Sequence, residues 1–568
     1  PSGGSGTSGD PYLISNCIDL QNIENDLSAE YVITNDIDCK DTKNWNNGAG
    51  FSPISSFSGS LDGEGFTIKN LYINRPGTNS VGLISSTTSS SIITNLSIKK
   101  IEVYANNKAG GIVGVHYGTI KNSYTTGKVI GEDKVGGLVG EYAGEVRESH
   151  STAEVSGIND VGGLIGYMQS GADVKKSYAK GEVIATGNNV GGLVGRSNSP
   201  KIIDCYANGN VTGYNYVGGL IGPDLGSLAK LNVTRSYATG NVYGNEDVGG
   251  LVGGGLVYLE KTYASGNVQG SKSVGGLIGD YADTCLLNYG CYNSIIKDSY
   301  SRGDVTASSY TGGGLYGEVQ TNSEAGNSEI KNSYSSGNFV FGEAVTSTGF
   351  GGFADICTDN YYDSTKAVTG PYTDCATGKT TNQMFQESTY SGWDFLNTWW
   401  ICQGQDYPYL QAFPIPIDSC EKLQCMKNCL HCDYYLTKDI DCSETENWED
   451  EFRPIGHQGC SYYNIDPEPF LGSLDGKNHT IHNLYVNDYN DLFGNWCSGG
   501  SGLFGFVESS GTIKNVGLKE VHSYGGWSGD GGLVGKNKGK IMNCYSDGVV
   551  ETPTRMAGLL VGYNMGKI

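Results

Sequence analysis

Blocks of small and apolar residues recur along this chain, and the block at 135–140, which reads Val-Gly-Gly-Leu-Val-Gly, is typical of them. Most blocks are followed by a Ser-Tyr or Cys-Tyr step and then by Gly-x-Val. Self-similarity with a period of roughly 26 residues predicts a solenoid, in which each repeat is one coil buried only against its neighbours. The blocks begin at Ala109, Val135, Val161, Val190, Val217, Val248 and Val274, and more widely at Gly312, Phe350 and Asp530.

The alternation of residue types inside each repeat predicts strands and not helices. The segment 119–124 alternates polar and apolar residues, the block at 135–140 alternates small and apolar ones, and 127–129 leads into a turn at 131–134. We therefore expect three short strands per coil, an all-β fold and almost no helix.

Coils that stack in register place equivalent side chains in columns. Neighbouring pairs in such columns contribute about 0.2 to 1 kcal/mol each. We interpret the aromatic column as structural; a platform for carbohydrate is the alternative. One predicted column holds Ile120, Val146, Val174 and Ile203, and the aromatic column holds Tyr124, His150, Tyr178, Tyr206, Tyr237, Tyr263, Tyr300, Tyr334 and Tyr545.

A non-repetitive preface occurs twice, once from residue 17 and once from residue 420, with Asp, Cys, Trp and Pro-Ile in the same order. The duplication predicts two tandem β-helical domains. The first spans 1–411, with a cap at 11–80, repeats at 81–360 and a C-terminal aromatic cap at 361–411. The second spans 412–568, with a cap at 412–500 and repeats at 501–568, and we expect it to be incomplete at its C-terminus.

Composition narrows the class of protein. The chain of 568 residues has 87 Gly, 38 Tyr and 14 Pro and is 17% charged, which fits a strand-rich repeat array better than a disordered chain. The net charge of −23, without a basic run, predicts that nucleic acid is not a partner. The chain also has no apolar stretch of the roughly 20 residues that a membrane-spanning helix needs.

The 16 cysteines favour disulfides and an oxidising, extracellular environment. Cys17 and Cys39 are 22 residues apart, as are Cys420 and Cys442, so each pair is expected on adjacent strands about 4.8 Å apart, within disulfide reach. We expect Cys285 with Cys291, Cys357 with Cys375, and Cys460 with Cys497 to staple inserted loops, and we expect Cys205 and Cys544 to be small buried thiols in the serine slot before Tyr.

A zinc site is the alternative for part of this set. Cys420, Cys425, Cys429 and Cys432 have ligand-like spacing, with His431 beside them. Because the surrounding sequence is typical of an oxidised protein, we predict no metal and no cofactor. The partners of Cys402, Cys425, Cys429 and Cys432 stay open.

The Gly-Gly-Leu-Val-Gly blocks followed by Asn-Ser-Tyr and Gly-x-Val resemble the GLUG repeat of large secreted and surface proteins, some adhesin-like and some associated with peptidases. The resemblance covers 109 to about 353 and 530 to the end. It implies a right-handed parallel β-helix of the pectin-lyase-like kind, and the prefaces resemble the cap that usually precedes such repeats. Proteins of this family usually have few cysteines, so the 16 cysteines of this chain differ from the family pattern. The resemblance predicts the fold and says little about function.

No catalytic constellation emerges from the sequence. Asp36 with Asp38, and Asp439 with Asp441, are the only repeated acidic pairs; each could bridge a cation or act in a polysaccharide-active enzyme, but turn hydrogen bonds explain them equally well. The histidines show no metalloprotease spacing. Four Asn-x-Ser/Thr sequons, at Asn95, Asn210, Asn232 and Asn478, are candidate glycosylation sites.

These observations favour a non-enzymatic, secreted, extracellular or cell-surface structural protein: disulfide-stapled rods that self-associate head to tail into a filament or appendage. The alternative is an adhesin that binds cells or glycans through loops inserted at 225–232, 280–295 and 318–329. A polysaccharide-active enzyme is the third hypothesis.

Overall fold

The computed structural model describes residues 2–568 except 227–229, 283, 287–289, 310, 321–327, 342–345, 349, 352–353, 367–374, 450, 458–466, 488–499, 526–528 and 553–555. The chain forms two compact units, Pro1–Thr381 and Asn382–Ile568. Each unit is a β-solenoid with its own buried apolar core. The boundary expected after residue 411 lies inside the second unit, because Trp400 and Cys402 of the aromatic segment pack into that unit's core.

One coil of the first unit shows how the repeat folds. It consists of β14 (Asp133–Gly136), β15 (Val139–Tyr142), β16 (Glu145–Arg147), β17 (His150–Ser151) and β18 (Glu154–Gly157). The coil therefore has five short strands and not the expected three. The glycine-rich block is divided, because the chain bends at Gly137 and Leu138 between β14 and β15.

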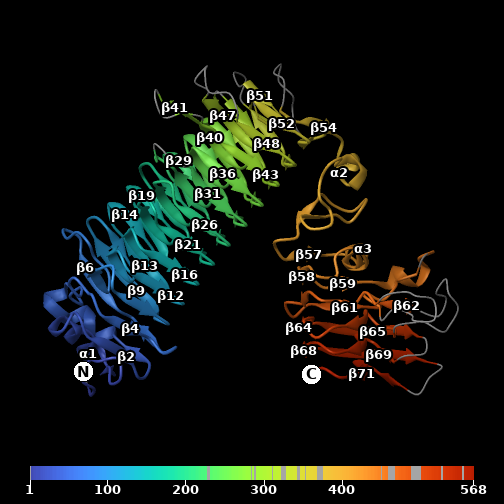
Figure 1. The fold of residues 1–568 in the computed structure, drawn as a ribbon, viewed down its shortest axis with the longest axis horizontal. Coiled ribbons are helices and arrows are strands. Elements are labelled where there is room, and N and C mark those ends of the chain that lie inside the picture. Colours follow the sequence, from blue (N-terminus) through green and yellow to red (C-terminus); the bar gives the residue numbers. More distant parts are fainter. Residues whose placement is uncertain are drawn as a thin grey trace. The chain divides into compact units, whose positions relative to one another are not determined.

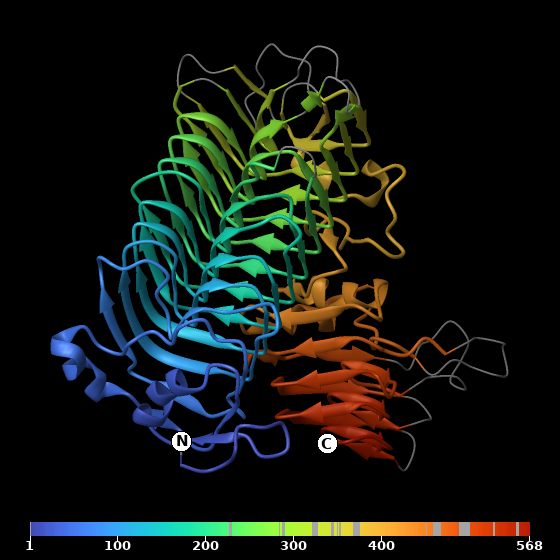
Figure 2. The same cartoon turned by 60° about the vertical axis from the view of Figure 1, so that its left-hand side comes forward.

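Equivalent strands of successive coils pair in parallel, so the coils build long sheets that run along the first unit (Figures 1 and 2). The 13-stranded sheet contains β1 (Tyr12–Ile14), β2 (Glu30–Ile33), β4 (Ser60–Asp62), β8 (Ile92–Thr94), β12 (Thr119–Lys121), β16, β21 (Asp173–Lys175), β26 (Lys201–Ile203), β31 (Leu231–Thr234), β36 (Val257–Glu260), β43 (Ile295–Lys297), β48 (Glu329–Lys331) and β52 (Ile356–Thr358).

Two nine-stranded sheets flank the bend in the glycine-rich block. One contains β10 (Ala109–Gly110), β14, β19 (Asn159–Gly162), β24 (Val190–Gly191), β29 (Asn215–Gly218), β34 (Glu246–Gly249), β39 (Lys272–Gly275), β46 (Thr311–Gly313) and β51 (Thr346–Thr348). The other contains β7 (Ile84–Ser86), β11 (Val113–His116), β15, β20 (Ile165–Met168), β25 (Val194–Ser197), β30 (Ile221–Pro223), β35 (Val252–Gly255), β40 (Ile278–Ala282) and β47 (Tyr316–Gln320).

A fourth set of strands carries the Ser-Tyr steps and the Gly-x-Val segments. It contains β3 (Ile37–Asp38), β5 (Thr67–Lys69), β6 (Tyr72–Arg75), β9 (Ser97–Ala105), β13 (Tyr124–Ile130), β17, β18, β22 (Tyr178–Ala179), β23 (Val183–Ala185), β27 (Tyr206–Ala207), β28 (Val211–Thr212), β32 (Tyr237–Ala238), β33 (Val242–Tyr243), β37 (Tyr263–Ala264), β38 (Val268–Gly270), β44 (Tyr300–Ser301), β45 (Val305–Ala307), β49 (Tyr334–Ser335), β50 (Phe339–Phe341), β53 (Tyr361–Asp363) and β54 (Thr377–Lys379). The hairpin of β41 (Thr284–Leu286) and β42 (Gly290–Tyr292) stands outside these sheets.

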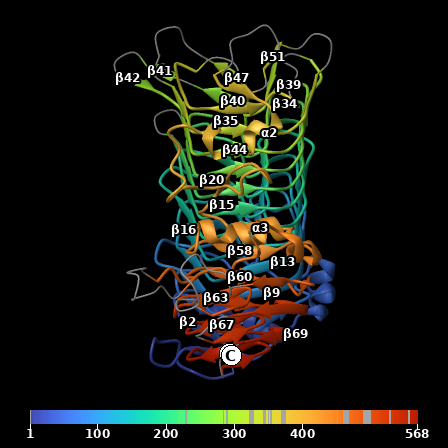
Figure 3. The same cartoon turned by 90° about the vertical axis from the view of Figure 1, so that its right-hand side faces the viewer.

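The second unit repeats this plan over fewer coils (Figure 3). Its sheets contain β57 (Ile415–Ile417), β58 (Asp433–Leu436), β60 (Ser473–Asp475), β64 (Thr512–Lys514) and β68 (Lys540–Met542); β59 (Ile440–Asp441), β61 (Thr480–His482), β62 (Tyr485–Asn487), β65 (Gly517–Tyr524) and β69 (Tyr545–Glu551); β63 (Phe504–Val507), β67 (Val534–Asn537) and β71 (Val561–Asn564); and β66 (Asp530–Gly531) with β70 (Ala557–Gly558). An antiparallel pair, β55 (Trp399–Trp400) and β56 (Tyr409–Leu410), precedes them.

Helices are few and short among the described residues, as the sequence predicts. In the first cap they are α1 (Cys17–Gln21), η1 (Asn22–Asn25) and η2 (Lys40–Gly48), and in the second cap α3 (Cys420–Cys425), η4 (Met426–Asn428) and η5 (Ser443–Asn447). Between the caps lie α2 (Thr381–Met384) and η3 (Glu387–Thr389). None of the described helices is long and apolar enough to cross a membrane.

The core explains the glycine period. Val135, Val161 and Val190 stand opposite one another on neighbouring coils and are fully buried. Next to this column the coils approach so closely that a Cβ on Gly192 would clash with the carbonyl oxygen of Gly219. A side chain at this position would push the coils apart, so only glycine fits it.

The predicted aliphatic column is correct except for its last member. Ile120 pairs with Val146, Val146 with Val174, and Val174 with Ile202. Ile203 falls one residue out of the column and is only half-buried, opposite Lys175. The prediction was wrong by one residue because Ile202 and Ile203 are adjacent in the sequence. Side chains alternate between the two faces of a strand, so only one of the two can lie in the buried column.

Candidate functional site

The aromatic column is a continuous stack along the first unit. From Tyr124 through His150 to Tyr334, successive ring centroids are 4.4 to 5.0 Å apart, and the ring planes differ by 4 to 11°. Lys180 lies over Tyr178 and Tyr206, and Arg302 lies over Tyr300 and Tyr334. Because each inner ring covers the faces of its neighbours, no inner face is open for a sugar to stack on. This geometry favours the structural interpretation.

Tyr545 differs from the other predicted members of the column. In the second unit it stands opposite Gly517, so it has no ring beneath it. Its hydroxyl lies 3.1 Å from the Thr480 hydroxyl. The stack therefore belongs to the first unit, where every coil between Tyr124 and Tyr334 supplies an aromatic ring.

The repeated aspartate pairs tie neighbouring coils together. Asp36 accepts hydrogen bonds from the Thr67 amide and the Lys69 ammonium, both at 2.9 Å. Asp38 accepts from the Lys40 amide at 3.1 Å and from the Asn70 side chain at 2.8 Å. These donors stabilise the charged form and lower both carboxyl pKa values, whereas a general acid needs a raised pKa.

The second copy uses the same arrangement. Asp439 accepts from the Thr480 amide at 2.9 Å and lies 3.1 Å from His479 Nδ1. Asp441 accepts from the Ser443 amide at 3.1 Å and from the Asn483 side chain at 3.0 Å. Both carboxyl pKa values are again lowered, first by these hydrogen bonds. The four aspartates therefore act as ties between coils in both units.

The structure joins Cys17 to Cys39, Cys357 to Cys375, and Cys420 to Cys442, which are pairs expected from the sequence. In both caps the disulfide links the helix to the strand that ends at the aspartate pair, with Cα atoms 5.6 Å apart. Cys285 and Cys291 stand opposite each other in the β41–β42 backbone, but their side chains lie outside the described residues. Cys460 and Cys497 lie outside them entirely.

The cysteines whose partners the sequence left open form two more disulfides, Cys402–Cys425 and Cys429–Cys432. Cys429, His431 and Cys432 lie close enough to form a metal-binding group, but both thiols are consumed by the disulfide. The set proposed for zinc is thus divided among three disulfides. Cys205 and Cys544 are free thiols; Cys205 is buried as expected, and Cys544 is half-buried.

The four sequons differ in how far their amides are engaged. The Asn95 amide donates to Asp62 Oδ1 at 3.0 Å and its oxygen accepts from Asn122 at 2.7 Å, so this side chain is part of a tie between coils. Asn232 is half-buried, and its oxygen accepts from Thr234. Asn210 and Asn478 are exposed. The Asn210 oxygen still accepts from the Asn241 amide at 3.0 Å, so Asn478 is the more accessible of the two.

One feature that the sequence analysis missed is a buried acidic group near the far end of the first unit. Asp280 stands opposite Glu318 on the neighbouring strand, and Asp247 is close enough to raise its pKa. Burial and these like charges raise the pKa of Asp280 to about 7, and burial raises that of Asp247 to about 6. Asp247, Asp280 and Glu318 belong to three different repeats, so no local sequence motif indicates that they lie together.

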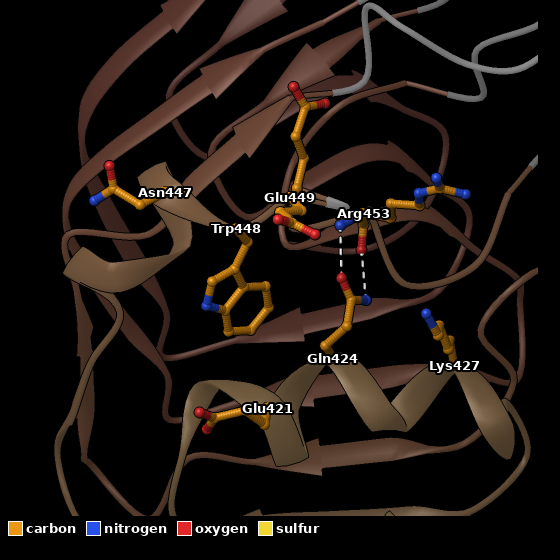
Figure 4. Close-up of a pocket in the computed structure, with 8 residues that line it drawn as sticks. Glu421, Gln424, Lys427, Asn447, Trp448, Glu449 and Arg453 are labelled. Atoms are coloured by element: carbon orange, nitrogen blue, oxygen red, sulfur yellow. Dashed lines mark hydrogen bonds between the residues drawn. The ribbon is translucent and has the colours of Figure 1, made fainter. Parts of the chain in front are cut away.

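A second missed feature is a polar hollow of about 720 Å³ in the cap of the second unit (Figure 4). Gln424 on α3 donates to the Arg453 carbonyl at 2.9 Å and accepts from the Arg453 amide at 2.6 Å, which fixes one wall. The Trp448 side chain lies beside the Gln424–Arg453 pair and points toward α3. The lining residues are Glu421, Gln424, Lys427, Asn447, Trp448, Glu449, Glu451 and Arg453.

The cap of the first unit has a counterpart of about 540 Å³. Gln21 on α1 donates to the Ser52 carbonyl and accepts from the Ser52 amide, both at 2.9 Å, in the same way as Gln424. Trp45 takes the place of Trp448. The lining residues are Gln21, Asn22, Glu24, Asn25, Trp45, Asn46 and Ser52. The two prefaces thus share a hollow as well as a disulfide and an aspartate pair.

Comparison with known proteins supports the repeat assignment. The family described as the GLUG motif matches residues 186–212. Halomucin of Haloquadratum walsbyi is 38% identical over 602 residues, which cover 98% of this chain and 6% of halomucin. A sequence described as a Gly-rich membrane protein of Evansella cellulosilytica is 32% identical over 129 residues, which cover 21% of this chain and 15% of that protein.

The chain therefore spans only a small part of the length of either relative. A crystal structure described as an immunoglobulin A1 protease of Bacteroides ovatus aligns with 72% of this chain and 95% of its own, at 18% identity. The TM-score of that alignment is 0.26, so it carries no argument about fold or activity.

Proposed function

We propose that this chain, a GLUG-motif repeat protein with a β-solenoid fold, contributes stiff rod sections, one in each unit, to an extracellular surface protein. The observation that carries the proposal is the parallel stacking of equivalent strands into long ladders, whose register shifts between β9 and β13 and between β65 and β69. Force along a β-solenoid is shared among many parallel backbone hydrogen bonds, and here the ring stack from Tyr124 to Tyr334 adds side-chain contacts at each step.

The extracellular location is supported by the disulfides and the surface charge. Five disulfides occur among the described residues, and such bonds persist in oxidising compartments. The net charge of −23 keeps a long rod hydrated and opposes lateral aggregation. The name of halomucin, a relative over nearly the whole chain, points the same way.

Head-to-tail association of such rods into a filament extends this proposal. The last strand of a parallel ladder offers unpaired backbone groups, which can receive another strand from the same chain or from a second copy. Electron microscopy and sedimentation velocity of the oxidised chain over a wide concentration range test this extension. Filaments whose length grows with concentration support it, and particles that stay monomeric at the highest concentration contradict it.

The rod itself is tested by single-molecule force spectroscopy. Under force we expect a stiff response followed by stepwise release of coils, and addition of reductant should lengthen the released chain, because the disulfides close loops inside it. Extension at low force without steps would contradict a mechanical role.

An adhesin that binds cells or glycans through inserted loops is the second candidate. The β41–β42 hairpin favours it, because it forms a separate antiparallel sheet outside the ladders, and the described residues of the other coils in the first unit form no such sheet. Deletion of 283–292 should abolish cell or glycan binding if the hairpin carries adhesion. Unchanged binding after that deletion would exclude the hairpin.

A further inference from the structure

The two caps differ in most of their side chains, yet both keep the same hollow. A glutamine clamp to the backbone forms one wall in each, and a tryptophan forms another. The indole of Trp45 lies 6.3 Å from Phe51, and that of Trp448 lies 6.1 Å from Phe452, measured between ring centroids. Each tryptophan thus rests on the core at one side and stays only half-buried.

The rim of each hollow consists of polar groups. In the second unit the side chains of Lys427, Glu449 and Arg453 make no hydrogen bond or ion pair with any described residue. In the first unit the same is true of the side chains of Asn22 and Asn25. Unused donors and acceptors around an aromatic wall are the usual features of a small-molecule site.

We propose that each hollow binds one saccharide unit, with its C–H face against the tryptophan and its hydroxyl groups on the polar rim. A sugar ring is apolar on one face and polar around its edge, and it therefore matches an aromatic wall beside amide, carboxylate and guanidinium groups. Unlike the inner rings of the tyrosine stack, Trp45 and Trp448 are covered from the hollow by no second ring of a described residue.

The rims predict that the two hollows prefer different sugars. Position 24 is Glu in the first cap and the equivalent position 427 is Lys, while Ser52 corresponds to Arg453. The first hollow is rich in amides, which suit neutral hydroxyl groups. The second has two cations and three carboxylates, Glu421, Glu449 and Glu451, so it can also hold a sugar that carries charge.

The test uses the full oxidised chain with cellotriose, maltotriose, chitotriose and trigalacturonate as probes. Saturation-transfer NMR and calorimetry detect binding up to about 10 mM, the weak range expected for single sugar units. We expect at least one trisaccharide to bind, and the Trp45→Ala/Trp448→Ala double variant to weaken that binding at least tenfold. Absence of binding by every probe, or binding that the double variant leaves unchanged, overturns the proposal.

Two rim variants keep the test decisive if the tryptophan changes disturb the fold. Arg453→Ala removes a rim group and leaves the Gln424 clamp intact, because the clamp uses the Arg453 backbone. Asn25→Ala removes a rim group of the first hollow. Each should weaken binding at its own site only, whereas Lys438→Ala, an exposed change in the same cap away from the hollow, should not. Equal effects of Arg453→Ala and Lys438→Ala would overturn the proposal.

Discussion

In most coils of the first unit the residue before the stacked ring is a serine, and this serine ties one coil to the next. The Ser123 hydroxyl donates to the Lys121 carbonyl at 2.9 Å and accepts from the Leu96 amide of the preceding coil at 3.1 Å. Ser149 and Ser177 repeat the pattern. Cys205 occupies this slot in its own coil, and its thiol contacts the Ile203 carbonyl at 3.2 Å. A thiol of similar size can therefore replace the hydroxyl without opening the coil.

Cys205 should be chemically inert in the folded protein. Burial raises its pKa to about 12 from 9.0, which lowers the reactive thiolate fraction about a thousandfold at neutral pH. We expect iodoacetamide at pH 8 to leave Cys205 unmodified in the native chain and to modify it after denaturation, as read by mass spectrometry. Half-buried Cys544 serves as the internal comparison and should react faster. Rapid native modification of Cys205 would contradict its burial.

The buried acids predict a pH effect with a definite sign. The pKa of Asp280 is raised from 3.8 to about 7, so its stabilising contribution is complete below pH 4 and is lost as pH rises towards 7. Asp280→Asn removes the ionisable group, so the variant does not lose this stability as the pH rises. At pH 8 the variant should be more stable than wild type by about 1 to 3 kcal/mol, and near pH 4 the difference should fall to zero or reverse.

Thermal unfolding of both proteins between pH 4 and 8 measures this difference. His116, whose pKa is lowered to about 3 by burial, gives the opposite trend, but it is present in both proteins and cancels. Glu154→Gln, at an exposed carboxylate, is the control. A difference between Asp280→Asn and wild type that does not change with pH would contradict the assignment.

At the scale of elements, the aromatic stack should contribute measurably to stability. Tyr206 lies between Tyr178 and Tyr237, at 4.6 and 5.0 Å. Tyr206→Ala removes both contacts and should cost about 1 to 3 kcal/mol, whereas Tyr206→Phe keeps the ring and should cost less. Tyr243→Ala is the matched control, because Tyr243 is 39% exposed and stands opposite Thr212 and Gln269. Equal losses for Tyr206→Ala and Tyr243→Ala, measured by chemical denaturation, would contradict the ladder.

The sequence predicted those elements that repeat. The β-solenoid, the aromatic column and the Cys17–Cys39 pairing all follow from spacing, since equal intervals along the chain become neighbours in a stack. The number of strands per coil could not be predicted from the spacing. The alternation of small and apolar residues in a glycine-rich block predicts one strand, although the chain bends at Gly137 and forms two. Local alternation also could not choose between Ile202 and Ile203.

The features that do not repeat from coil to coil escaped prediction. Asp280 and Glu318 come from coils with insertions between them, so their approach depends on the register of β40 and β47. Gln424 and Arg453 meet across a helix and a loop of the cap, where no period relates them. Trp45 and Trp448 were visible as equivalent residues of the two prefaces, and that equivalence was the one signal that could have revealed the hollows.

At the scale of the whole chain, the two units have separate cores, and this predicts separate unfolding. In a solenoid each coil contacts only its neighbours, so coils stabilise one another only where they belong to the same ladder. Among the described strands, the four long ladders of the first unit and the sheets of the second have none in common. We expect two calorimetric transitions.

One buried isoleucine in each unit provides the test. Ile202→Ala and Ile513→Ala each leave a cavity at a fully buried position, at a cost of about 2 to 5 kcal/mol. Each change should lower the temperature of one transition only, and the two changes should affect different transitions in scanning calorimetry. Ile184→Ala, at a side chain that is 44% exposed, should move neither. A single transition lowered by either core variant would mean that the two solenoids unfold as one cooperative body, and rods built from such chains would then fail as a whole and not section by section.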